Sequence, residues 1–273
     1  MKLRIVPARA GLQWVRLGIG VFWRQPMAFS VLFFTSMAAV SLVSVLLPLI
    51  GPAVAQALMP MIVLMVMAAA AQANQGRAPT PALLLVAARA ARQSLPAMLT
   101  LGALFAVGDL LATGATALVD GGQFALVTLG RRPFTPELAQ SADFQAAMAL
   151  WLLLYALLSL PFWHAPALAH WHRVPPVKAM FFSTVACLRN MGAFTLYGLA
   201  WGVVFVGAGI AISIAVTLLV LAGLGMGMAG GILAASVSML MAMVLTSVVF
   251  TFRDCFEPPD KPAASPAPPD AAM

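Results

Sequence analysis

The chain has 273 residues and a net charge of +7, with 62% hydrophobic and 8% charged residues. A soluble domain carries about 25% charged residues, so this composition excludes an ordinary water-soluble fold and predicts a protein surrounded by lipid. Two cysteines, Cys187 and Cys255, are too few for a disulfide framework. The basic residues lie beside apolar segments and form no free basic face, so we expect no nucleic-acid binding.

In chain order, the sequence predicts an all-α polytopic membrane protein with six transmembrane helices. About 20 apolar residues are needed to cross the hydrocarbon core of a bilayer. Glycine-rich turns separate the two spans of each pair at Gly51-Pro52, at Asp120-Gly121-Gly122 and between Gly223 and Gly231. The predicted spans are 27–50, 53–73, 97–119, 144–163, 193–222 and 231–252.

The lysines and arginines are divided unequally between the two sides that this topology defines. Thirteen lie in the N-terminal segment, the 74–96 and 164–190 segments and the tail, whereas only Arg131 and Arg132 lie on the other side. Cytoplasmic loops carry an excess of Lys and Arg. We therefore expect both termini to be cytoplasmic. Residues 1–256 form the predicted membrane domain, and the Pro/Ala-rich tail, 257–273, is expected to be disordered.

Three similar segments precede the outgoing spans, and each opens with proline and closes with a basic–amide pair. They run from Pro7 to Gln25, from Pro81 to Gln93 and from Pro176 to Asn190. We interpret them as interfacial amphipathic helices, each followed by a transmembrane hairpin, although chance similarity among apolar segments is the alternative. In the first segment one helical face carries Arg9, Gln13, Arg16, Gly20 and Arg24, and another carries Leu12, Val15, Ile19 and Phe22.

Asp109 lies in the middle of the third predicted span. A carboxylate there costs about 2.5–3.5 kcal/mol on insertion scales, so it needs a partner, a hydrated cavity or a proton. Thr113 follows one turn later on the same face, and Tyr155 lies at a similar depth in the fourth span. These residues form a candidate intramembrane polar site. The alternative is a protonated Asp109 that donates a hydrogen bond between helices.

His164, His170 and His172 form a second candidate cluster, together with Arg189 and Asn190 at the end of the third amphipathic segment. Three imidazoles are potential metal ligands. The flanking Trp163 and Trp171 favour a simpler explanation, because amphipathic rings gather at the boundary between membrane and water. We therefore expect an interfacial cluster, with no metal and no cofactor.

Small residues at a spacing of four let membrane helices approach closely. Gly198 and Gly202 have this spacing and predict packing within the monomer or a homo-oligomer contact. The fifth apolar run is about thirty residues long, so it must tilt strongly or break near Gly207 and Gly209.

Several segments are similar to a known family: WVRLGIGVFWRQPMAF, LVDGGQFALV, FWHAPALAHWHRVPPVKAMFFSTVACLRNMGAF and FTFRDCF. The chain resembles uncharacterised inner-membrane proteins of proteobacteria, chiefly betaproteobacteria, over about residues 1–256. The resemblance implies a multi-span protein of the bacterial inner membrane. It assigns no catalytic or ligand-binding residues.

We expect a non-enzymatic protein, since the sequence has no GxxxxGK[ST], HExxH or GxSxG motif. The leading prediction is a membrane scaffold or envelope-homeostasis component that acts through its lipid-facing and interfacial surfaces, with anionic lipid headgroups as partners. The alternative is a transporter or channel for a small solute or lipid, with Asp109 in a cavity between the hairpins.

Overall fold

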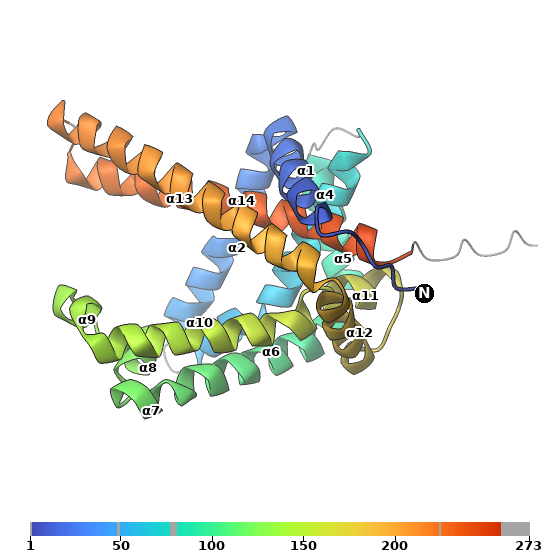
Figure 1. Cartoon of the computed structure of the whole chain (residues 1–273), viewed down its shortest axis with the longest axis horizontal. Helices are drawn as coiled ribbons and strands as arrows, with labels where there is room; N and C mark the ends of the chain where they lie inside the picture. The colour runs from blue at the N-terminus through green and yellow to red at the C-terminus, as the bar shows by residue number, and fades with distance from the viewer. Residues whose placement is uncertain (1, 48–49, 77–80, 224, 258–273) are drawn as a thin grey trace, which may run out of the picture.

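The structure, a computed structural model, describes residues 2–47, 50–76, 81–223 and 225–257. Within these ranges the chain is helical without any strand, apart from an isolated β-bridge between Leu3 and Phe256. The predicted all-α class is therefore confirmed (Figure 1). Apart from Glu257, the predicted disordered tail lies outside the described residues.

Helices α1, α5 and α12 cover the three segments predicted to be amphipathic. The helices are α1 (Ala10–Arg24), α2 (Pro26–Leu46), α3 (Gly51–Ala57), α4 (Met59–Asn74), α5 (Pro81–Gln93), α6 (Leu95–Ala115), α7 (Ala117–Asp120), α8 (Gln123–Thr128), α9 (Pro136–Gln140), α10 (Ala142–Phe162), α11 (Ala165–Trp171), α12 (Pro176–Arg189), α13 (Met191–Leu221) and α14 (Met226–Cys255).

Six helical segments within the described ranges are long and apolar enough to cross a membrane, as the sequence predicts. They are Pro26–Leu46, Gly51–Asn74, Leu95–Asp120, Ala142–Trp171, Met191–Leu221 and Gly227–Cys255. The fifth, α13, runs for 31 residues without a break at Gly207 or Gly209. A helix of that length exceeds the ~30 Å hydrocarbon thickness, so we expect it to tilt in the bilayer or to extend beyond it.

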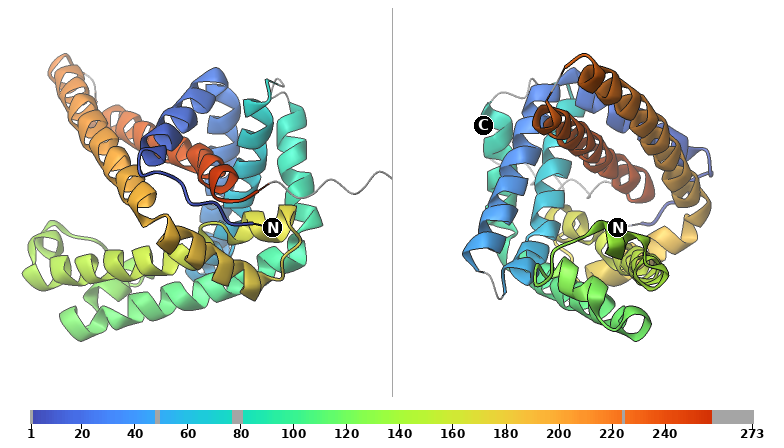
Figure 2. Two further views of the ribbon diagram at one scale, coloured as in Figure 1. Left: turned by 45° about the vertical axis from the view of Figure 1, so that its right-hand side comes forward. Right: turned by 90° about the vertical axis from the view of Figure 1, so that its left-hand side faces the viewer.

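Consecutive spans lie side by side. Helix α2 contacts α3 and α4, α6 contacts α10, and α13 contacts α14 (Figures 1 and 2). In the right-hand view of Figure 2 these pairs occupy three sides of the molecule. The arrangement is compatible with three hairpins, and a true threefold repeat stays a prediction.

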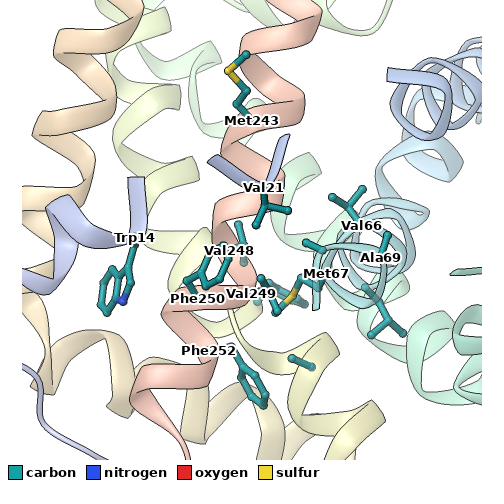
Figure 3. Close-up of a cluster of buried hydrophobic side chains, with 14 of the residues drawn as sticks. Trp14, Val21, Val66, Met67, Ala69, Met243, Val248, Val249, Phe250 and Phe252 are labelled. Atoms are coloured by element: carbon teal, nitrogen blue, oxygen red, sulfur yellow. The ribbon is translucent and has the colours of Figure 1, made fainter. Parts of the chain in front are cut away.

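Two of the three predicted amphipathic helices pack against the span that precedes them in the chain. Helix α5 contacts α4, and α12 contacts α10, and both of these contacts join neighbouring parts of the chain. Helix α1 instead packs against α14, at the opposite end of the chain, and against α13. Trp14 and Val21 of α1 lie beside Val248 and Phe250 of α14 in the buried cluster of Figure 3. The chain therefore closes on itself through tertiary contacts.

The buried face of α1 differs from the predicted apolar face. Val15 and Phe22 are buried as expected, but Leu12 is 50% exposed. The buried stripe turns instead toward Trp14 and Gly18, because a Cβ at Gly18 would lie 2.7 Å from the Ser247 Cα. Helix–helix packing therefore sets the rotation of α1. Its position in the headgroup plane stays a prediction.

The two described chain ends lie together. Arg4 N–H donates to the Cys255 carbonyl oxygen at 2.8 Å, and Glu257 N–H donates to the Lys2 carbonyl oxygen at 3.2 Å. Two ends on one face agree with an even number of membrane crossings. We call this the terminal face; the cytoplasmic orientation of this face stays a prediction.

Candidate functional site

Asp109 is buried in α6 and receives one hydrogen bond, from Gln56 of α3. The Gln56 Nε2 atom lies 3.1 Å from Asp109 Oδ2. The two helices approach closely two turns away, where a Cβ on Gly102 would lie 2.9 Å from the Ala57 carbonyl carbon. Gly102 and Ala57 thus bring Gln56 to the carboxylate. The other oxygen, Asp109 Oδ1, is buried and has no hydrogen-bond partner within the described residues.

Two further polar atoms near the membrane interior lack partners in the described part of the chain. They are Thr113 Oγ1, one turn along α6 from Asp109, and Trp151 Nε1 of α10, whose indole lies beside the Asp109 carboxylate without making a hydrogen bond of good geometry. Unpaired buried polar groups are rare in folded proteins, because each one forfeits its hydrogen bonds to water. The region around Asp109 therefore contains more hydrogen-bonding capacity than the described residues use.

A cavity of about 220 Å³ reaches this polar group. That volume is well above the ~10–15 Å³ that one water molecule needs. The walls come from α2, α3, α4, α6 and α8. The polar lining consists of Gln56, Asp109, Thr113 and Thr128, and the apolar lining includes Val40, Pro52, Met59, Leu110 and Leu129.

Tyr155 lies close enough to Asp109 for an electrostatic interaction, but its ring packs among aromatic side chains. Its ring lies 4.9 Å from the Trp151 ring and 5.9 Å from the Phe105 ring. It lines a separate, mostly apolar cavity beside Met59 and Phe162. Within the described residues, the Tyr155 hydroxyl makes no direct hydrogen bond to Asp109. Asp109 and Thr113 therefore line one cavity together with Gln56. The Tyr155 ring lines the neighbouring cavity and packs against Trp151 and Phe105.

The sequence analysis does not predict Gln56 as a site residue, although its position in an apolar span is a usable signal. It is the single amide in the apolar run GPAVAQALMP of the second span. The two spans that carry Gln56 and Asp109 belong to different predicted hairpins, so the sequence pattern alone does not pair them.

The three histidine rings make different sets of contacts, although those of His164 and His172 both pack against Phe252. His164 is fully buried, and its ring lies 5.4 Å from Phe256 and 5.8 Å from Phe194, centroid to centroid. His170 Nδ1 lies 2.7 Å from Ser94 Oγ. His172 packs against Phe252, and burial lowers its pKa, which keeps the ring neutral. Within the described ranges, no three His, Cys, Asp or Glu residues come together as metal ligands.

Arg189 and Asn190 also have different roles. Arg189 is exposed, whereas Asn190 is buried. Asn190 Oδ1 accepts from Val6 N–H at 2.8 Å, and its Nδ2 donates to the carbonyl oxygens of Arg4 and Ala186 at 3.1 and 3.0 Å. Asn190 thus holds the N-terminal segment against the end of α12. The predicted interfacial cluster is not one site.

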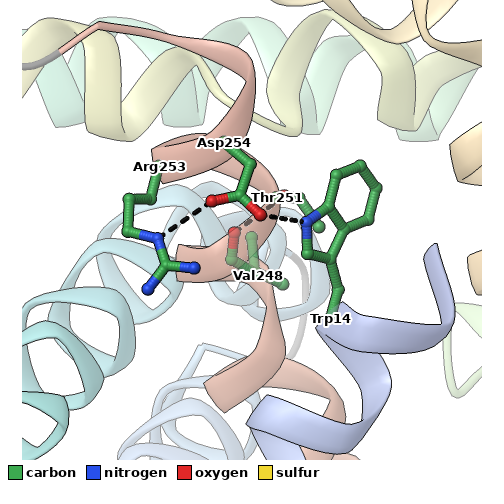
Figure 4. A network of polar contacts seen from close by, with 5 residues as sticks. All are labelled: Trp14, Val248, Thr251, Arg253 and Asp254. Carbon is green, nitrogen blue, oxygen red and sulfur yellow. Dashed lines mark hydrogen bonds and ion pairs between the residues drawn. The ribbon is translucent and has the colours of Figure 1, made fainter. Parts of the chain in front are cut away.

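A second polar network fastens α1 to α14 (Figure 4). Trp14 Nε1 donates to Asp254 Oδ2 at 2.8 Å, and Asp254 Oδ1 accepts from Arg253 Nε at 2.9 Å. Close by, Trp163 Nε1 donates to Thr251 Oγ1 at 3.0 Å. On α12, burial raises the pKa of the Cys187 thiol to about 12. These groups are fully paired or inert, which suits a structural role.

The six apolar helices and their basic connecting segments define a multi-span membrane protein. The chain is 37% identical, over 269 residues and 94% of each chain, to a probable inner membrane protein of Burkholderia thailandensis. It therefore belongs to the family of this probable inner membrane protein, as the sequence resemblance indicates. No model of a known protein family matches the chain, and no solved structure matches it.

Proposed function

We propose that this protein is a non-enzymatic transporter or channel for a small solute, with Asp109, Gln56 and Thr113 as its solute site. One observation carries the proposal: the unpaired Asp109 Oδ1 is buried beside a cavity of about 220 Å³. Carboxylates within membrane spans are costly and commonly mark ion or substrate pathways. A solute that donates hydrogen bonds, such as an ammonium, a guanidinium or a hydrated cation, would satisfy this oxygen.

The alternative for Asp109 is a purely structural hydrogen bond. A protonated Asp109 would then donate to a neighbouring helix. Its one hydrogen bond to a described residue runs the other way, from the Gln56 amide to Asp109 Oδ2. A protonated carboxyl also accepts at its carbonyl oxygen, so this bond fits both a structural Asp109 and a solute site, and the transport experiment distinguishes them.

The test uses purified protein in liposomes, with uptake of radiolabelled guanidinium, ethanolamine and sodium measured in turn. We expect one of these probes to enter faster than in empty liposomes, and Asp109→Asn to abolish the difference. Asp143→Asn is the matched control, because it removes an exposed carboxylate at the start of α10. Equal uptake by wild type and Asp109→Asn, with both correctly folded, contradicts the proposal.

A second candidate function is favoured by the exposed arginines of α1. Arg9, Arg16 and Arg24 are exposed, while the opposite face of the helix is buried against α13 and α14. Each Arg or Lys near an anionic membrane surface contributes about 1 kcal/mol of attraction. This pattern supports a scaffold or envelope-homeostasis component that gathers anionic lipid.

The triple change of Arg9, Arg16 and Arg24 to Gln tests the scaffold function. We expect a lower enrichment of phosphatidylglycerol around the protein in mixed bilayers, measured with spin-labelled lipid. Unchanged enrichment argues against this function without affecting the solute site.

A homo-oligomer contact through Gly198 and Gly202 is also proposed. A Cβ at either position meets no atom within 4 Å, so these glycines pack against nothing in the described monomer. Internal packing, one of the two predicted uses, therefore does not explain them. Cross-linking between copies of a Gly202→Cys variant in native membranes tests the contact.

A further inference from the structure

A second polar cavity opens near the terminal face, well separated in the chain from Asp109. It has a volume of about 340 Å³ and lies between α4, α5 and α11. Five of its lining side chains are polar: Gln72, Gln75, Arg89, Gln93 and His170.

The charge of this cavity is positive. None of the described residues that line it is acidic, and Arg89 has no ion pair with a described carboxylate. The three glutamines supply amide N–H groups, and Arg89 supplies a planar set of donors suited to phosphate oxygens. The cavity can therefore offer several hydrogen-bond donors and one positive charge to an anion.

His170 contributes an imidazole ring to the cavity wall, and a contact with Ser94 holds this ring in place. Its Nδ1 is 2.7 Å from the Ser94 hydroxyl, which fixes the orientation of the imidazole. When that hydroxyl donates to Nδ1, the ring proton lies on Nε2, and the histidine keeps one N–H to offer. Ser94 is itself buried, so this orientation is held from within the protein.

The position of the cavity brings it close to the headgroup region of the membrane. Arg89 and Gln93 occupy the last turns of α5, and the third span begins at Leu95. Trp171, an aromatic residue typical of the membrane–water boundary, forms part of the wall. The opening thus lies beside the start of a transmembrane helix, where lipid phosphates are concentrated.

We propose that the cavity of Gln72, Arg89, Gln93 and His170 binds a phosphate anion, from an anionic phospholipid headgroup or from inorganic phosphate. The inference goes beyond the solute site, because it uses none of the residues around Asp109. Loss of phosphate binding therefore leaves the transport experiment unaffected, and loss of transport leaves this inference standing.

The experiment compares Arg89→Gln with Arg92→Gln. Both variants lose one exposed positive charge from the same helix, but only Arg89 lines the cavity. Each protein is released from nanodiscs of mixed phosphatidylglycerol and phosphatidylcholine, and native mass spectrometry counts the phosphatidylglycerol retained. We expect Arg89→Gln, which loses its charge-assisted hydrogen bonds to the phosphate, to weaken retention about fivefold, and Arg92→Gln, which loses only screened surface attraction, to stay within about twofold of wild type.

A second variant and a second probe complete the test. Gln93→Ala removes a wall amide without changing the charge, and it should also weaken retention. Inorganic phosphate is added to protein in phosphatidylcholine nanodiscs, where a rise in Tm that Arg89→Gln lacks assigns the site to free phosphate. Retained phosphatidylglycerol without that rise assigns it to lipid. Equal behaviour of the Arg89 and Arg92 variants, or no response to either probe, overturns the inference.

Discussion

The contact of α1 with the α13–α14 pair, which we call the closure, contrasts with the region around Asp109. In the closure, the polar groups that join α1 to α14 are paired, as Trp14 with Asp254 and Thr246 with the Gly18 carbonyl show, although the buried Trp201 Nε1 of α13 has no partner among the described residues. Around Asp109, a carboxylate oxygen, a hydroxyl and an indole N–H lack partners among the described residues, next to a cavity. Satisfied buried networks make a fold rigid, whereas unsatisfied ones cost stability. The paired contacts between α1 and α14 suit a structural role, whereas the unpaired groups beside a cavity at Asp109 suit a functional site.

The largest expected effect on stability comes from a larger side chain at Gly18, where α1 packs against α14. Gly18→Leu would force side-chain atoms into Ser247, whose Cα already lies 2.7 Å from a Cβ placed at Gly18. We expect a loss of about 2–3 kcal/mol, as overpacking costs, seen as a lower unfolding temperature in detergent. Gly20→Leu is the control, because a Cβ there meets nothing within 4 Å. Equal unfolding temperatures for the two variants would show that α1 does not pack as described.

Asn190→Ala should have the next largest effect. It removes all three hydrogen bonds of this buried amide and leaves the Val6 N–H without its acceptor. An unsatisfied buried group costs about 1–3 kcal/mol, and residues 2–6 should exchange amide hydrogens faster. Arg189→Ala, at the exposed neighbouring position, should leave the exchange unchanged. Slow exchange of residues 2–6 in both variants would rule out this anchoring role.

Trp14→Phe should produce a smaller loss. The ring volume is largely kept, but the 2.8 Å hydrogen bond from Trp14 Nε1 to Asp254 is removed. Because Asp254 is partly exposed, we expect this single hydrogen bond to contribute about 1 kcal/mol, less than the three bonds lost in Asn190→Ala. The loss should disappear when the same substitution is made in an Asp254→Ala background. An equally large loss there would mean that packing, and not the hydrogen bond, accounts for the effect.

Asp109→Asn should change stability least. The Asn carbonyl can still accept from Gln56, and no other hydrogen bond to a described residue is lost. We expect the unfolding free energy to change by less than about 1 kcal/mol, measured by chemical denaturation in mixed micelles. A loss as large as that of Asn190→Ala would place Asp109 in the same structural class as the closure and remove the contrast between the two regions.

The number of spans can be predicted from the sequence because the bilayer sets how long and how apolar each span must be. The length and apolarity of each span predict six crossing helices, and α13 differs only in running unbroken past Gly207 and Gly209. Asp109 and Thr113 were also predicted together, because residues four apart share a helical face. Gln56 was missed, and Tyr155 was grouped with them on depth alone. Depth along a span does not reveal which faces of two helices meet.

The chain by itself determined that this protein is helical and crosses a membrane six times, because each span must satisfy its backbone hydrogen bonds and cover the hydrocarbon locally. Only the tertiary structure decided that α1 closes onto α13 and α14, and that Gln56 reaches Asp109. Both depend on glycines that admit a neighbouring backbone, at Gly18 and Gly102. Close approach is a property of two helices together, so neither helix reveals it alone.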